Sequence, residues 1–182
     1  MAVLAVSWSP ACADTILYSD SGTFLASTPS SAFSGPSKTW AFAFQADVNP
    51  VVSDVGNGGF DFQFSSFSYL LNSLPVAIAP TFIRFFSGIN GGGFVICFNG
   101  TNNANCSDAL GTFGPQMYTG PTSSPTLLAG TFTSEVFNVY VNSAINGLPN
   151  TTLQASTVPE PSSFLMVVAA LLAIGAGRYR RR

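Results

Sequence analysis

The sequence contains no histidine, and only 8% of its 182 residues are charged. Ordinary soluble proteins carry about 25% charged residues. Histidine is the commonest general base and transition-metal ligand, and it activates the nucleophile in Ser–His and Cys–His pairs. Because these arrangements are all missing, we expect a protein without enzymatic activity of its own.

Basic residues are nearly absent from the first 157 positions, which contain only Lys38 and Arg84. Seven acidic residues lie between positions 14 and 157, so two bases minus seven acids give this region a charge of −5. Contacts to phosphate groups need a basic surface. The composition therefore excludes nucleic acid from the expected partners.

A sustained helical pattern is also missing from this part of the chain, where apolar and polar residues alternate with the period of a β-strand. Short runs rich in aromatic and β-branched residues start at Thr81, Gly93, Thr126 and Glu135, and Gly, Pro, Asn or Ser bound them. Residues 14–155 are therefore predicted to form an all-β domain, an antiparallel β-sandwich of the jelly-roll or immunoglobulin-like type. Its expected core includes Trp40, Phe42, Phe44, Phe60, Phe62 and Phe64.

Cysteine occurs three times, as Cys12, Cys97 and Cys106. The last two enclose a short polar loop, FNGTNNAN, of the kind that a disulfide closes in exported proteins. A zinc site would need more thiols or imidazoles than the chain provides. We expect a Cys97–Cys106 disulfide if the protein is exported, and two unpaired thiols at the ends of a hairpin otherwise.

One long apolar run stands out, Phe164–Gly177, and the arginines Arg178, Arg180, Arg181 and Arg182 follow it. A helix of these 14 residues is about 21 Å long, which is shorter than a hydrocarbon core of about 30 Å. Flanking serines, Tyr179 and extended arginine side chains make up the difference. A buried helix of a soluble domain would show a polar face, and this run shows none. We predict a C-terminal single transmembrane helix with the arginines as its cytoplasmic stop and the body outside.

The run is preceded by Val158, Pro159, Glu160 and Pro161. Motif, apolar span and arginine cluster, in this order over about the last 25 residues, resemble the PEP-CTERM sorting signal of exported bacterial proteins. The resemblance implies that a membrane peptidase of the exosortase type recognises the four motif residues and removes the tail during surface or exopolysaccharide export. Residues 156–182 are accordingly interpreted as the sorting signal, joined to the sandwich by a short linker.

The amino-terminal residues show a weaker signal. Ala11-Cys12-Ala13 forms an A-x-A pattern that would let a signal peptidase cut before Asp14. The preceding apolar stretch is brief and has no basic residue before it. We therefore interpret residues 1–13 as the remnant of a signal peptide, and we expect Met1 to lie inside a longer one.

One segment of the body has the composition of a weak calcium site. Carboxylate and amide oxygens are the ligands that Ca²⁺ prefers, and nearby glycines permit tight turns. An ordinary polar hairpin loop has the same composition. Apart from calcium, no cofactor is expected, and the candidate ligands are Asp47, Asn49, Asp54, Asn57 and Asp61.

Together these features predict an exported structural protein of the cell surface or of an exopolysaccharide-associated extracellular matrix, such as a biofilm. It would be anchored in the inner membrane as a precursor, then processed by an exosortase and found at the surface or outside the cell. The alternative is a carbohydrate-binding module for the producer's own polysaccharide, using the loop 99–105. A hydrolase with a carboxylate pair is a third hypothesis, with candidates Asp47, Asp54, Asp61, Asp108 and Glu135.

Overall fold

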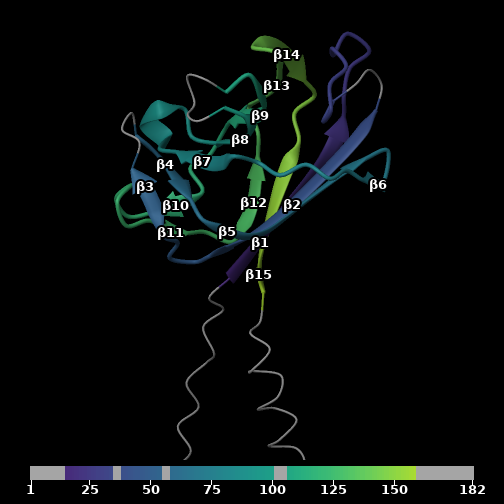
Figure 1. Ribbon diagram of the computed structural model, residues 1–182. Coiled ribbons are helices and arrows are strands. Elements are labelled where there is room, and N and C mark those ends of the chain that lie inside the picture. Colours follow the sequence, from purple (N-terminus) through teal and green to yellow (C-terminus); the bar gives the residue numbers. More distant parts are fainter. Residues whose placement is uncertain (1–14, 35–37, 55–57, 101–105, 159–182) are drawn as a thin grey trace, which may run out of the picture.

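The computed structural model describes residues 15–34, 38–54, 58–100 and 106–158, which form two antiparallel sheets packed face to face (Figure 1). Within these ranges there is no α-helix, and one 3₁₀ turn, η1 (Gly88–Asn90), is present. The predicted all-β sandwich is therefore confirmed. Its subtype, jelly-roll or immunoglobulin-like, stays a prediction.

The first sheet has six strands in the order β12-β15-β1-β2-β5-β6. Their bounds are β1 (Thr15–Thr23), β2 (Thr39–Asp47), β5 (Phe64–Leu71), β6 (Leu74–Pro75), β12 (Gly130–Thr133) and β15 (Thr152–Val158). The first and last strands of the body are thus neighbours. Thr15 lies opposite Val158, so the described chain begins and ends at the same pole of the sandwich (Figure 1).

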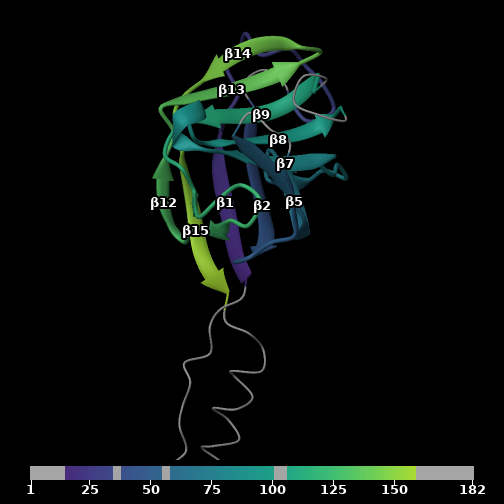
Figure 2. The same cartoon turned by 90° about the vertical axis from the view of Figure 1, so that its left-hand side faces the viewer.

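The second sheet has seven strands in the order β14-β13-β9-β8-β7-β4-β3. Their bounds are β3 (Val52–Asp54), β4 (Gly59–Phe62), β7 (Phe82–Phe86), β8 (Phe94–Asn99), β9 (Asp108–Phe113), β13 (Val136–Val141) and β14 (Ala144–Leu148). Figure 2 shows this sheet crossing in front of the six-stranded one, with β14 at its outer edge. A separate pair, β10 (Tyr118–Thr119) and β11 (Thr126–Leu127), completes the fold.

Aromatic side chains fill the space between the sheets. The Trp40 ring stacks on Phe137 of the opposite sheet with centroids 5.1 Å apart, and Tyr18 meets Phe85 edge-on at 5.4 Å. Large buried rings contribute most of the apolar area that such a core removes from water. Of the predicted core, Phe64 is half-buried against the cluster and the others are buried: Trp40, Phe42, Phe44, Phe60 and Phe62.

Two stretches that read as single strands in the sequence are divided in the structure. Phe60, Phe62 and Phe64 alternate with polar residues, which predicts one strand over 60–67, but the chain leaves the seven-stranded sheet after Phe62 and enters the six-stranded sheet at Phe64. Between them the backbone N–H of Gln63 donates to the carbonyl of Val51 at 3.1 Å, which holds the crossing point. The run from Thr126 is likewise divided into β11 and β12.

Candidate functional site

The four-residue motif of the expected sorting signal begins at Val158, the last residue of a strand. In β15, Thr157 and Val158 lie opposite Ile16 and Thr15 of β1, so the sheet continues three residues past the predicted domain end at 155. Proline has no backbone N–H with which to continue a ladder, and the strand ends before Pro159. Pro159, Glu160 and Pro161 lie outside the described residues, as do Phe164–Gly177 and the four arginines.

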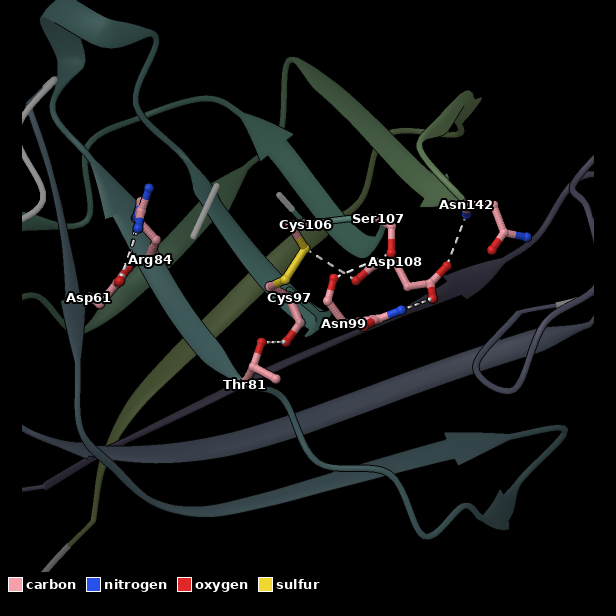
Figure 3. The surroundings of a disulfide bond; sticks show 9 residues. All are labelled: Asp61, Thr81, Arg84, Cys97, Asn99, Cys106, Ser107, Asp108 and Asn142. Carbon is pink, nitrogen blue, oxygen red and sulfur yellow. Dashed lines mark hydrogen bonds and ion pairs between the residues drawn. A yellow bond between two sulfur atoms is a disulfide. The ribbon is translucent and has the colours of Figure 1, made fainter. Parts of the chain in front are cut away.

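A disulfide joins Cys97 in β8 to Cys106 just before β9, with Cα atoms 5.9 Å apart (Figure 3). The predicted disulfide is therefore present. Cys97 is fully buried, and the bridge ties the end of β8 to the start of β9. Residues 101–105 of the enclosed loop lie outside the described residues.

The turn between β13 and β14 is fastened to this disulfide corner. The backbone N–H of Asn142 donates to Oδ1 of Asp108 at 3.0 Å (Figure 3). The backbone N–H of Ser143 donates to the Ser107 carbonyl at 2.8 Å. Ser107 in turn donates its N–H to the Asn99 carbonyl at 2.9 Å. The disulfide, the start of β9 and the hairpin turn thus form one connected unit, which we call the disulfide corner.

A partly buried ion pair lies elsewhere on the seven-stranded sheet, between Arg84 of β7 and Asp61 of β4. Two hydrogen bonds of 2.7 and 2.9 Å join the guanidinium to both carboxylate oxygens, and the side chains are 7% and 22% exposed. The guanidinium also lies over the Phe82 ring, 4.9 Å from its centroid. An open groove of about 680 Å³ runs beside the pair and is lined in part by Phe64, Gln63 and Ser53.

The residues of the expected calcium site have different surroundings. Asp61 is paired with Arg84, and Oδ1 of Asn49 accepts a hydrogen bond from the Thr126 hydroxyl at 2.9 Å. Asp47 ends β2, Asp54 ends β3, and Asn57 lies outside the described residues. In the described part of the chain, no three His, Cys, Asp or Glu residues are grouped so that they could hold a metal ion. Calcium binding stays a prediction.

The structure reveals a buried acid that the sequence reasoning did not single out. Asp20 is 8% exposed, and its oxygens accept hydrogen bonds from the Ser21 N–H at 2.7 Å and the Thr151 hydroxyl at 2.6 Å. Burial raises the pKa of Asp20, and the two hydrogen bonds partly oppose that rise. The alternation of Ile16, Tyr18 and Asp20 placed it on the inner face, so the signal was available in the sequence.

Comparison with known proteins identifies the carboxy-terminal segment. Residues 157–182 match the family model of the PEP-CTERM protein-sorting motif. This motif marks an exported protein that is processed at the membrane by an exosortase. No curated protein and no solved structure matches the chain. Among the described residues, no helix is long and apolar enough to cross a membrane.

Proposed function

We propose that this protein is a structural component of the cell surface or extracellular matrix, with one disulfide-bonded β-sandwich and no enzymatic activity. The observation that carries the proposal is the direct junction of a sorting motif to a folded body, since the match starts at residue 157, within β15. With so short a connection, the body stays next to the membrane until the tail is removed. Its buried aromatic core and its disulfide suit a long-lived extracellular unit.

In this proposal the tail holds the body at the outer face of the inner membrane until the exosortase acts. The apolar run 164–177 lodges in the bilayer, and the arginines after it stop transfer. Because Thr15 and Val158 leave the sandwich side by side, the pole that carries them faces the membrane. The opposite pole then points away from the membrane before and during processing.

The sorting step is tested by replacing Pro159, Glu160 and Pro161 with alanines and following the protein by cell fractionation. We expect a full-length precursor to accumulate in the membrane fraction. Replacing Ser162 and Ser163 with alanines is the matched control, since it changes neighbouring residues outside the motif and should leave processing intact. Normal processing of the triple variant would refute the proposal, and so would an unchanged matrix after deletion of the gene.

The groove beside the Asp61–Arg84 pair supports a second candidate, a carbohydrate-binding module for the producer's own polysaccharide. An aromatic ring together with amide and hydroxyl groups suits sugar rings and their hydroxyls, and the groove offers Phe64, Gln63 and Ser53. Pull-down with the isolated polysaccharide would show binding that weakens in a Gln63→Ala, Ser53→Ala double variant. Gln154→Ala, in the other sheet, is the control; equal retention of all three proteins would contradict this function.

A further inference from the structure

The two sheets end in four edge strands, and two of them carry residues that discourage pairing with another chain. β3 has three residues and ends in Asp54, and β6 has two residues, of which one is Pro75. β12 has four residues, GTFT. β14 has five residues, AINGL, with neither a charge nor a proline. Natural proteins usually protect edges with short strands, charges or prolines, and β14 is the longest of the four edges.

The backbone of β14 presents free pairing positions on its outer side. Asn142 and Ser143 both have positive φ, the pattern of a two-residue type I′ hairpin, which makes Val141 and Ala144 a hydrogen-bonded pair. Hydrogen-bonded and non-hydrogen-bonded pairs alternate along an antiparallel ladder. The N–H and C=O groups of Ile145 and Gly147 therefore point away from β13, which is the one neighbour of β14 among the described strands.

The side chains of this edge are complementary to themselves. Ile145 is 64% exposed, whereas Gly147 has room beside it: a Cβ there would have its nearest atom 4.0 Å away. Both residues lie on the outer face of the sheet, two positions apart, with Asn146 between them. A two-fold axis through Asn146 would set each Ile145 opposite the glycine of the other copy.

We propose that two copies of this chain pair antiparallel through β14, which joins their seven-stranded sheets into one continuous sheet. Four backbone hydrogen bonds would form, two from each copy, between Ile145 and the partner's Gly147. Each Ile145 side chain would cover the open space over that glycine. This inference rests on the proposed structural role, which it deepens by naming a second copy as the partner.

The disulfide corner keeps the β14 edge ordered before it pairs. Its turn is fixed through Asp108 and Ser107 to the residues that follow Cys106. A strand that is already ordered loses less conformational entropy on association than a mobile one. Five-residue strands bury less than the roughly 1,200 Å² of a stable interface, so we expect weak, concentration-dependent dimers that matter where the protein is crowded.

The association is tested on the processed protein released by cells, by sedimentation equilibrium over a range of concentrations. We expect a monomer–dimer equilibrium that Ile145→Lys and Gly147→Lys each shift to monomer, because charge is placed at the paired edge. Leu74→Lys is the matched control: Leu74 is 68% exposed and also follows an Asn-Ser turn at a sheet edge. Monomeric wild-type protein, or equal loss of dimer in the control, would overturn the proposal.

The register is tested by cysteine cross-linking. Opposite Asn146 residues would form a non-hydrogen-bonded pair with Cα atoms about 4.5 Å apart, within the range for a disulfide. Asn146→Cys should therefore give a covalent dimer under mild oxidation. Gly147→Cys should not, since its two copies are offset by two residues, about 7 Å along the strand. Cross-linking of both variants, or of neither, would overturn this pairing, whereas the sorting test does not depend on it.

Discussion

Asp20 and Thr151 meet inside the sandwich, where the Thr151 hydroxyl donates a 2.6 Å hydrogen bond to Oδ2 of a carboxylate 131 positions earlier in the chain. Ser134 completes the cluster, because its hydroxyl donates to the Thr151 carbonyl at 3.0 Å and accepts from the Thr151 N–H at 2.9 Å. The contact fastens β1 to the residue just before β15. It also places an acid in the apolar interior, where ionisation is costly.

The buried Asp20 predicts that the protein loses stability as the pH rises above the usual pKa of aspartate. Burial raises the pKa of Asp20 in the folded state above its usual value, so the protonated form favours folding. Its contribution is complete below the ordinary pKa of aspartate, about 4, and is lost as the pH rises through the folded-state value. Asp20→Asn removes the charge at nearly the same shape: its amide oxygen can still accept from the Ser21 N–H, and its amide N–H can donate to the Thr151 hydroxyl oxygen. We expect it to match the wild type near pH 4 and to unfold at a higher temperature near pH 8.

Thermal unfolding of both proteins between pH 4 and pH 8 measures this difference. Asp47→Asn is the matched control, because Asp47 is an exposed acid at the end of the neighbouring strand. The control should track the wild type across the range. Parallel pH profiles for Asp20→Asn and the wild type would show that Asp20 is not the titrating group.

The Cys97–Cys106 bond closes a loop with a sequence separation of nine residues. Loop-closure entropy for a loop of this size corresponds to about 2.5 kcal/mol. We expect the Cys97→Ala, Cys106→Ala variant to lose about that much free energy of unfolding in urea titrations, with the fold retained. Addition of reductant should destabilise the wild type but not the variant; equal sensitivity of the two would contradict this role of the disulfide.

Much of the architecture could be predicted from the sequence because its strands alternate strictly. Trp40, Phe42 and Phe44 are buried on one face of β2, as the period of two requires. The disulfide could be predicted from the spacing of its cysteines and from the export signal. The tail could be identified because its motif, apolar span and arginines occur in a fixed order.

Other features depend on tertiary contacts that alternation does not encode. The pattern through Phe60, Phe62 and Phe64 is unbroken, yet the chain changes sheets at Gln63, because both sheets offer an apolar inner face and alternation does not say which sheet a strand joins. The pairing of Asp61 with Arg84 joins residues 23 positions apart. Likewise, the open edge of β14 follows from strand order, which local sequence leaves undetermined.

The Asp61–Arg84 pair predicts that removing one of its charges destabilises the protein more than removing both. Removing one member of a buried ion pair leaves the other uncompensated, whereas replacing both with apolar residues often costs little. We expect Asp61→Leu alone to lose about 3 kcal/mol and the Asp61→Leu, Arg84→Met double variant to lose much less. A double-mutant cycle from urea titrations measures the coupling. Additive losses would show that the two side chains contribute independently.

Replacing the serine of either Asn-Ser turn, Asn72-Ser73 or Asn142-Ser143, with glycine is expected to stabilise the protein. Ser73 and Ser143 have φ values of +63° and +66°, a region that costs a side chain about 1 kcal/mol and costs glycine little. Asn-Gly is the preferred sequence for a type I′ hairpin turn. We expect Ser73→Gly and Ser143→Gly each to raise the free energy of unfolding by about 0.5 kcal/mol, since greater freedom of the unfolded glycine chain offsets part of the relief. Ser68→Gly, at an exposed position within β5, should instead lower it. Urea titrations measure all three variants, and a loss of stability in both turn variants would contradict strain at these serines.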